Sequence, residues 1–125
     1  MRLLLDTQIV YWFFYEPQNV PNAARQLMAD AEAVYVSSVS IWEMAIKVRI
    51  GKMKADPRRV VQFMESAGFR ELPVYSRHTV LVGDLPMFHG DPFDRLLIAQ
   101  AIGEPLNLLT SDTQLRQYSE LVISV

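Results

Sequence analysis

The sequence predicts an α/β protein with three layers, in which a mainly parallel central sheet lies between two layers of helices. Two observations lead to this prediction. Short apolar runs alternate with longer stretches of helical periodicity, and the runs themselves contain no polar alternation. Continuous apolar runs are typical of strands buried on both faces, and strand–helix alternation is typical of a parallel sheet that helices cover on both sides.

Four short apolar segments are predicted to form the strands of this sheet, and they span residues 3–5, 34–36, 106–109 and 121–125. Helical periodicity covers the ranges 22–32, 38–50, 57–67, 76–84 and 93–102. Helix starts are indicated at Pro21-Asn22 and Asp56-Pro57, and helix ends at Gly51, Gly68 and Gly103.

The composition indicates one globular domain, which we expect to span residues 1–125. The absence of cysteine excludes a disulfide framework, a thiolate zinc site and a cysteine nucleophile, and it agrees with a reducing compartment. The net charge of −2 excludes recruitment of nucleic acid by overall positive charge. No apolar stretch approaches the ~20 residues of a membrane span, so we expect a cytoplasmic protein with no membrane partner.

Three acidic residues lie where parallel α/β sheets usually carry their functional crevice, beyond the carboxyl ends of the strands. Asp6 directly follows the first strand, Asp112 follows the third, and Asp94 lies in the first turn of a predicted helix. Each acid taken alone is explained as simply as a helix cap, and Asp91-Pro92 is a strong capping signal as well. Only the convergence of several acids on one crevice favours a ligand role.

Glu43 is harder to explain as an ordinary helix residue. It lies within an apolar stripe that is predicted to comprise Val39, Trp42, Ile46 and Ile50. Burial of a carboxylate costs several kcal/mol unless a partner or a cation compensates for it. An i,i+4 pair with Lys47 would contribute only about 0.2–0.5 kcal/mol, so a shared metal site explains the burial better.

Together, Asp6, Glu43, Asp94 and Asp112 suggest a site for a hard cation with oxygen ligands. Carboxylates suit Mg²⁺ or Mn²⁺. Zinc is disfavoured, because the chain has no cysteine and only two histidines, His78 and His89. Clustered carboxylates that hold one or two Mg²⁺ ions are a common arrangement for the hydrolysis of phosphodiester bonds.

The flanks of these acids form a pattern of four segments, which are 3–7, 37–43, 91–101 and 109–112. In this order they resemble the PIN-domain ribonucleases, and in particular the VapC-like toxins of type II toxin–antitoxin pairs. The resemblance covers nearly the whole chain, and its most specific part runs from His89 to Ala101.

The resemblance implies a PIN-like fold and a Mg²⁺- or Mn²⁺-dependent endoribonuclease toxin, with RNA as substrate and a small antitoxin protein as partner. It implies that the catalytic and metal-binding residues are Asp6, Glu43, Asp94 and Asp112, with Thr110, Ser111 and Asp91 in support. Relatives often carry histidine where this chain has Gln8, a departure that affects substrate positioning rather than catalysis, because the acids are intact.

A basic tract that offers contacts to RNA phosphates comprises Lys47, Arg49, Lys52, Lys54, Arg58 and Arg59. The predicted contacts are Lys47, Arg49, Lys52 and, beside Asp94, Arg95. The tract is equally well explained as a solvated helix end, since cations favour helix C-termini, and an ion pair with a carboxylate explains Arg95 better. His89 is predicted to be structural and His78 to lie at the surface.

The aromatic run from Tyr11 to Tyr15 would point in all directions around a helix that begins at Thr7. One face of such a helix cannot bury all five rings, so we expect an exposed patch that forms a homodimer contact or the antitoxin groove. Burial on two sides by the domain itself and stacking on RNA bases are the alternatives.

Two functions of other classes remain as alternatives. A phosphoacceptor receiver domain has a similar length and an acidic pocket, but it needs a lysine near its last strands, and no lysine occurs after Lys54. A non-catalytic PIN-like module that binds RNA or protein would be indicated by the loss of one acid, and all four acids are present.

Overall fold

The computed structural model describes residues 1–125 and contains a central sheet of five parallel strands. The strands are β1 (Arg2–Leu5), β2 (Ala33–Ser37), β3 (Arg70–Leu72), β4 (Asn107–Thr110) and β5 (Val122–Ser124). Their order in the sheet is β3-β2-β1-β4-β5, and every neighbouring pair is parallel. The predicted α/β class and the parallel sheet are therefore confirmed.

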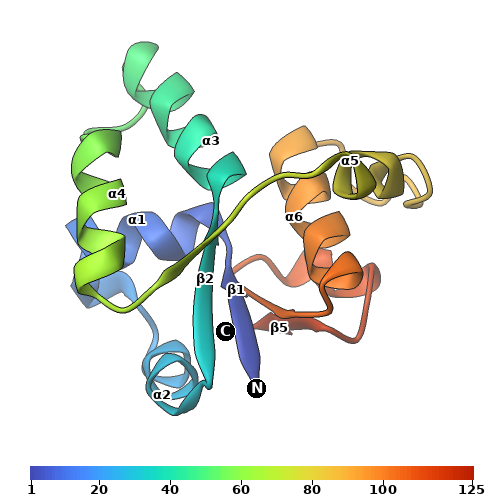
Figure 1. The fold of residues 1–125 in the computed structure, drawn as a ribbon, viewed down its shortest axis with the longest axis horizontal. Coiled ribbons are helices and arrows are strands. Elements are labelled where there is room, and N and C mark those ends of the chain that lie inside the picture. Colours follow the sequence, from blue (N-terminus) through green and yellow to red (C-terminus); the bar gives the residue numbers. More distant parts are fainter.

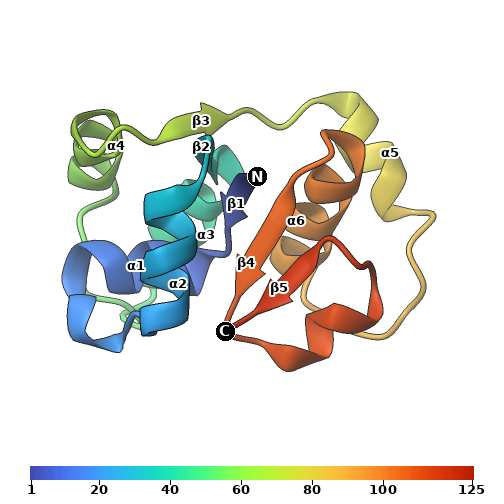
Figure 2. The same ribbon diagram turned by 90° about the horizontal axis from the view of Figure 1, so that it is seen from below.

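Six α-helices surround the sheet: α1 (Thr7–Tyr15), α2 (Asn22–Asp30), α3 (Ser38–Arg49), α4 (Pro57–Ser66), α5 (Ser76–Val82) and α6 (Pro92–Gly103). Two short 3-10 turns, η1 (Pro17–Asn19) and η2 (Thr113–Gln117), complete the structure. Helices α1, α2 and α4 lie on one side of the strands, and α5 and α6 lie on the other (Figures 1 and 2). No helix has the combination of length and hydropathy that a membrane span requires.

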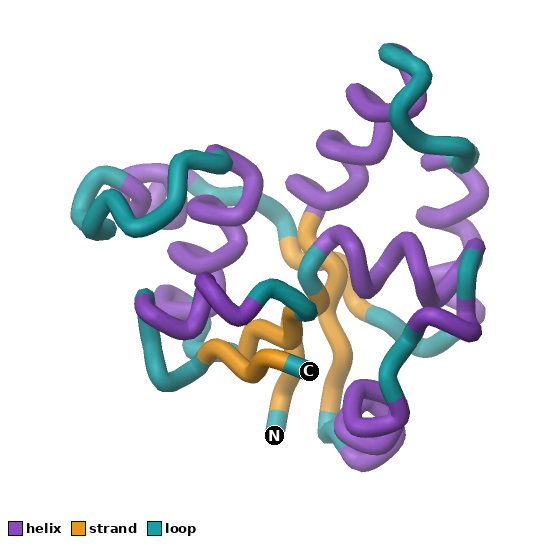
Figure 3. The backbone as a smooth tube through the Cα atoms, turned by 180° about the vertical axis from the view of Figure 1, so that it is seen from behind, coloured by secondary structure: helices purple, strands orange, loops and turns teal.

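The sheet separates two hydrophobic cores, which explains why β1 is apolar at successive positions. Leu3 and Leu5 pack into a core with α1, α2 and α4, whereas Leu4 packs into the second core with α6. The strands seen from behind run between the two groups of helices (Figure 3). Alternate residues of one strand therefore face different helical layers, as the continuous apolar runs predict.

Strand β1 occupies the middle of the sheet and determines where a crevice can form. The chain leaves β1 toward β2 on one side and reaches β4 on the other side, so the strand order reverses at β1. Ligands of open α/β sheets bind beyond the carboxyl ends of the strands at such a switch point. The order also differs from the 2-1-3-4-5 order of flavodoxin-like folds, which argues against the receiver-domain alternative.

The buried face of α3 differs from the predicted stripe. Trp42 and Ile50 are 59% and 58% exposed, and the buried residues of this helix are Val39, Ser40, Glu43 and Met44. The helix continues beyond the end of β2 (Figure 1), so its last turns have no sheet to cover them. Glu43 is therefore buried on the face that turns toward α1 and α6, beside Ser40 rather than within an apolar stripe.

The aromatic run of α1 is mostly covered by the domain itself. Tyr11, Trp12, Phe13 and Phe14 are half-buried and pack against the first core, and Tyr15 is the exposed member. Phe13 and Phe14 contact Phe69 with ring-centroid distances of 5.0 and 6.0 Å. The exposed part of the run is therefore smaller than expected, and Phe13 lines an apolar pocket with Met28 and Phe69.

Two of the predicted helix ends are made by glycine in a left-handed conformation, since Gly51 and Gly68 have φ angles of 76° and 80°. Gly103 is the last residue of α6 and has no positive φ angle, so its glycine is required by packing. A Cβ atom at this position would lie 3.1 Å from Cδ1 of Leu81 on α5, so glycine permits the close approach of α5 and α6. Strand β3 is not predicted by the sequence pattern, because only Leu72 of its three residues is buried.

Candidate active site

One polar pocket of about 230 Å³ lies at the carboxyl edge of the sheet and is lined by all four candidate acids, Asp6, Glu43, Asp94 and Asp112. The acids come from four separate segments: the end of β1, helix α3, the start of α6 and the end of β4. The remaining residues of the lining are Thr7, Gln8, Lys47, Met53, Asp91 and Ser111. Residues far apart in the sequence therefore meet at the switch point of the sheet.

Three hydrogen bonds, one of the backbone and two of the side chain, hold Asp6 in place. Its backbone N–H donates to the carbonyl oxygen of Leu109 on β4 at 3.0 Å, which continues the sheet pairing by one residue. Its Oδ1 accepts a hydrogen bond from the backbone N–H of Gln8 at 2.6 Å, so Asp6 caps α1. Its Oδ2 accepts a hydrogen bond from the hydroxyl of Thr110. Asp6 therefore caps α1 and lines the pocket at the same time.

Thr110 connects Asp6 to Asp112. While its hydroxyl donates to Asp6, its Oγ1 accepts a hydrogen bond from the backbone N–H of Asp112 at 3.0 Å. Asp112 in turn caps η2 through a hydrogen bond from the backbone N–H of Gln114 to its Oδ1 at 2.9 Å. Thr110 itself is fully buried behind the pocket, whereas Ser111 lies in the lining.

Asp91, rather than Asp94, is the cap of α6. Its Oδ1 accepts hydrogen bonds from the backbone N–H groups of Phe93 and Asp94 at 2.8 and 3.1 Å. The side chain of Asp94 is thereby free of the capping role, and its Oδ2 lies 2.9 Å from Nε2 of His89. His89, which the sequence indicated as structural, therefore belongs to the polar site.

Glu43 is 4% exposed, and its two oxygens have different surroundings. Oε2 lies 2.8 Å from the ammonium group of Lys47 one turn later on α3, whereas Oε1 is buried and has no hydrogen-bond partner. The i,i+4 pair expected as the simpler explanation is present, but it leaves half of the carboxylate unsatisfied. A buried oxygen without a partner is costly, and a bound cation would satisfy it.

Two acids of the pocket, Asp6 and Asp94, have a raised pKa, chiefly because they are buried. Burial raises the pKa of Asp6, the hydrogen bonds from Thr110 and Gln8 lower it, and the charges of Glu43 and Asp112 raise it further. Burial, followed by the charges of Asp91 and Asp6, raises the pKa of Asp94 to about 6, although His89 opposes this. A cation at the site would remove this repulsion.

Lys47 is the cation that the pocket already contains. Burial by itself lowers the pKa of Lys47, but the hydrogen bond and charge of Glu43, with the charges of Asp91 and Asp94, raise it above its usual value. The ammonium group therefore remains charged beside the acids and partly neutralises them.

The ligand set fits a divalent cation. One ring nitrogen of His89 and one carboxylate oxygen each of Asp94 and Asp112 lie within 4.8 Å of one another, close enough to share an ion. Asp6 and Glu43 line the same pocket but lie outside this group of three, and Glu43 has a buried oxygen with no hydrogen-bond partner. Oxygen donors predominate in the pocket, which favours Mg²⁺ or Mn²⁺ over softer metals.

The predicted basic contacts separate in the structure. Lys47 and Lys52 line a groove beside the acids, whereas Arg49 lines a different pocket with Arg58. Arg95 is 8% exposed, and its guanidinium donates to the carbonyl oxygens of Pro86 and Val82 at 2.8 and 3.1 Å. Arg95 therefore holds the 82–86 turn and has neither the expected carboxylate partner nor access to RNA.

Contrary to the prediction from the sequence, His78 does not lie at the surface. It is fully buried, and its Nδ1 accepts a hydrogen bond from the backbone N–H of Tyr75 at 3.0 Å. Together with Gln100 and Glu104 it joins α5 to α6, away from the acidic pocket.

Comparison with known proteins agrees with this fold and pocket. A family model of the PIN domain matches residues 3–121. The chain therefore belongs to the PIN-domain family.

Within that family the chain belongs to the VapC group. It is 30% identical over 127 residues to "Ribonuclease VapC22" of Mycobacterium tuberculosis, a match that covers 93% of this chain and 91% of that protein. Its fold resembles that of VapBC2 from Rickettsia felis, solved with a DNA fragment from its promoter, with a TM-score of 0.73 and 19% identity over 100% of this chain and 98% of that chain. It also resembles FitAB bound to a DNA fragment, with a TM-score of 0.64 and 17% identity over 98% and 94% of the two chains.

Proposed function

We propose that this protein is an endoribonuclease toxin that depends on Mg²⁺ or Mn²⁺ and hydrolyses RNA phosphodiester bonds. The observation that carries the proposal is the convergence of four acids from four segments on one pocket, with a buried oxygen of Glu43 left unpaired. The name of the M. tuberculosis relative, a ribonuclease, supports RNA as the substrate. We propose residues 1–125 as a single nuclease domain, which the extent of the family match supports.

Asp6, Glu43, Asp94 and Asp112 would hold the metal, with Thr110, Ser111 and Asp91 in support. A divalent cation bound there would lower the pKa of a bound water and neutralise charge on the scissile phosphate. Thr110 orients Asp6 and the backbone of Asp112, and Asp91 frees Asp94 by taking over the helix cap. Lys47 holds Glu43 and keeps one positive charge at the edge of the pocket.

We also propose a small antitoxin protein as the partner. The solved relatives support this proposal, because they are described as VapBC and as a toxin–antitoxin complex. Within the aromatic run, Phe13 remains available for such a contact, because it lines an open apolar pocket with Met28 and Phe69. The homodimer that the sequence suggested stays a prediction, since most of the aromatic run packs within the domain.

A cleavage assay tests the proposed activity. The purified chain, free of any partner, is incubated with mixed RNAs in Mg²⁺, in Mn²⁺ and in EDTA. We expect cleavage in either metal and none in EDTA, with loss of cleavage in Asp112→Asn. Asp84→Asn is the matched control, because Asp84 is an exposed aspartate outside the pocket.

Cleavage that persists in EDTA would contradict the metal dependence. RNA binding without cleavage under every metal condition would favour the alternative, a non-catalytic PIN-like module.

A further inference from the structure

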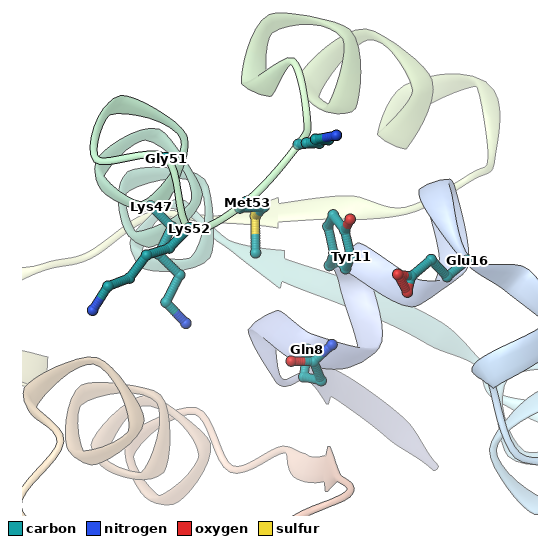
Figure 4. Close-up of a pocket in the computed structure, with 8 residues that line it drawn as sticks. Gln8, Tyr11, Glu16, Lys47, Gly51, Lys52 and Met53 are labelled. Carbon is teal, nitrogen blue, oxygen red and sulfur yellow. The ribbon is translucent and has the colours of Figure 1, made fainter.

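We infer that a basic groove beside the acidic pocket binds the nucleotide next to the scissile phosphate, with Lys52 and Lys54 as its phosphate contacts and Tyr11 at its wall. This inference rests on the proposed ribonuclease function and adds a substrate subsite to it. The groove has a volume of about 560 Å³, and its lining includes three lysines, Lys47, Lys52 and Lys54. Figure 4 shows Lys47 and Lys52 beside Met53. A volume of roughly 300–1,000 Å³ is typical of sites for small ligands.

The groove and the acidic pocket are continuous. Gln8, Lys47 and Met53 line both of them, so a chain that leaves the acids enters the groove directly. Lys47 is engaged by Glu43, whereas Lys52 and Lys54 form no ion pair in the structure. Two ammonium groups without an ion-pair partner therefore lie next to the acids. The acids would repel the phosphates of an incoming RNA, and the two positive charges offset this repulsion.

The end of α3 creates this arrangement. Gly51, with a φ angle of 76°, reverses the chain, and the backbone N–H of Lys52 donates to the carbonyl oxygen of Lys47 at 2.8 Å. The chain then runs without helical structure, and Met53 and Ala55 pack toward the core while Lys52 and Lys54 are exposed. Alternation along this segment points both lysines away from the core.

The opposite wall comes from α1. Tyr11 lies across from Met53, and Gln8 lies one turn earlier on the same helix (Figure 4). Tyr11 stacks on Tyr15 with a ring-centroid distance of 5.5 Å, and the hydroxyl of Tyr15 accepts a hydrogen bond from the backbone N–H of Asp56 at 2.8 Å. This contact fixes the distance between α1 and the lysine segment. An aromatic wall opposite lysines suits a nucleotide, whose base packs on the ring while its phosphate meets the ammonium groups.

An acidic peptide is the other ligand that lysines attract. RNA is favoured because the groove opens into a pocket suited to phosphodiester hydrolysis and because its wall is aromatic. Glu16 also lines the groove, on the side away from Lys47 and Lys52 (Figure 4).

Binding of a labelled single-stranded 12-nucleotide RNA, measured by fluorescence anisotropy in EDTA at several salt concentrations, tests the inference. For a single strand, each phosphate that the protein neutralises contributes about 0.7 to the slope of log K against log salt. We therefore expect the double variant K52A/K54A to bind about tenfold more weakly and to show a slope smaller by about 1.4. The matched control is R58A/R59A, which removes the same charge from the same basic tract outside the groove.

Equal affinities and slopes in the two double variants would overturn the inference. It would also be wrong if an oligoglutamate peptide, rather than RNA, bound the wild-type chain and bound K52A/K54A more weakly. A cleavage assay in Mn²⁺ separates a failure of the groove inference from a failure of the proposed function. If both are right, the wild-type chain cleaves RNA, and K52A/K54A raises KM at least fivefold with little change in kcat. Absence of cleavage by the wild-type chain would count against the proposed function, and the anisotropy slopes would still decide the role of the groove.

Discussion

The ammonium group of Lys47 lies 2.8 Å from Oε2 of Glu43, while the other oxygen of the same carboxylate is buried without a partner. Lys47 thus compensates for one half of a buried acid and leaves the other half unpaired. The pair also lies where the acidic pocket and the basic groove meet, because Lys47 lines both of them.

The substitution Lys47→Met should destabilise the metal-free protein by ~1 kcal/mol or more, because it leaves Glu43 buried without its only partner. The stabilisation by Mn²⁺ should increase at the same time, since the cation then satisfies a larger unpaired charge. Thermal melts with and without Mn²⁺ measure both effects. Arg49→Met is the control on the same helix, and equal behaviour of the two variants would contradict a role for the pair.

The substitution Asp94→Asn should abolish RNA cleavage while leaving the metal-free stability unchanged or higher. It removes one of several repelling charges, and the cap of α6 survives because Asp91 provides it. The stabilisation by Mn²⁺ should shrink. Melts and an RNA-cleavage assay measure these quantities, and full activity with an undiminished Mn²⁺ shift would remove Asp94 from the site.

The stability of the metal-free protein should depend on pH through Asp94. Its pKa is about 6 in the folded state, against a usual value of 3.8. Between these pH values the folded state binds more protons, so the free energy of unfolding falls as pH rises from about 4 to above 6. Asp6, whose pKa is also raised, acts in the same direction.

Urea unfolding in EDTA at pH 4.5 and 7.5 measures this effect. Asp94→Asn should be more stable than the wild-type protein at pH 7.5, by an amount on the order of 1 kcal/mol, and the difference should be clearly smaller at pH 4.5. A difference that does not change with pH would show that Asp94 titrates normally.

The substitution Thr110→Val should lower cleavage roughly 10–100-fold, because residues that orient metal ligands typically contribute this much. It removes the hydroxyl that donates to Asp6 and accepts from the backbone N–H of Asp112. Thr110→Ser keeps the hydroxyl and should retain most of the activity. A comparable loss in both variants, measured by initial cleavage rates, would point to packing rather than to the hydrogen bonds.

The positions of three acids could be predicted from the sequence because they follow from local rules. Asp6 comes directly after β1 and Asp112 two residues after β4, and parallel strands carry their functional residues at that edge. The helix cap at Asp91 also follows from the local sequence, but only the structure shows that this cap leaves the side chain of Asp94 free for another role. These features depend on neighbours within a few residues.

The features that could not be predicted depend on contacts between distant segments. Periodicity placed Trp42 in the core, but α3 extends beyond the sheet, and Trp42 contacts Phe93 at the surface with a ring-centroid distance of 5.0 Å. The position of Arg95 beside Asp94 in the sequence suggested an ion pair. In the structure its guanidinium instead donates hydrogen bonds to backbone carbonyl oxygens of the 82–86 turn. The approach of His89 to Asp94 depends on how the loop before α6 folds back, which no local pattern indicates.

Titration of the metal-free protein with Mn²⁺ in a calorimeter tests most directly the claim that the four acids form one cation site. We predict that the wild-type chain binds Mn²⁺ and that Asp6→Asn, Glu43→Gln, Asp94→Asn and Asp112→Asn each weaken binding at least tenfold, while Asp84→Asn does not. Failure of the wild-type chain to bind Mn²⁺, or undiminished affinity in the four variants, would contradict a shared cation site.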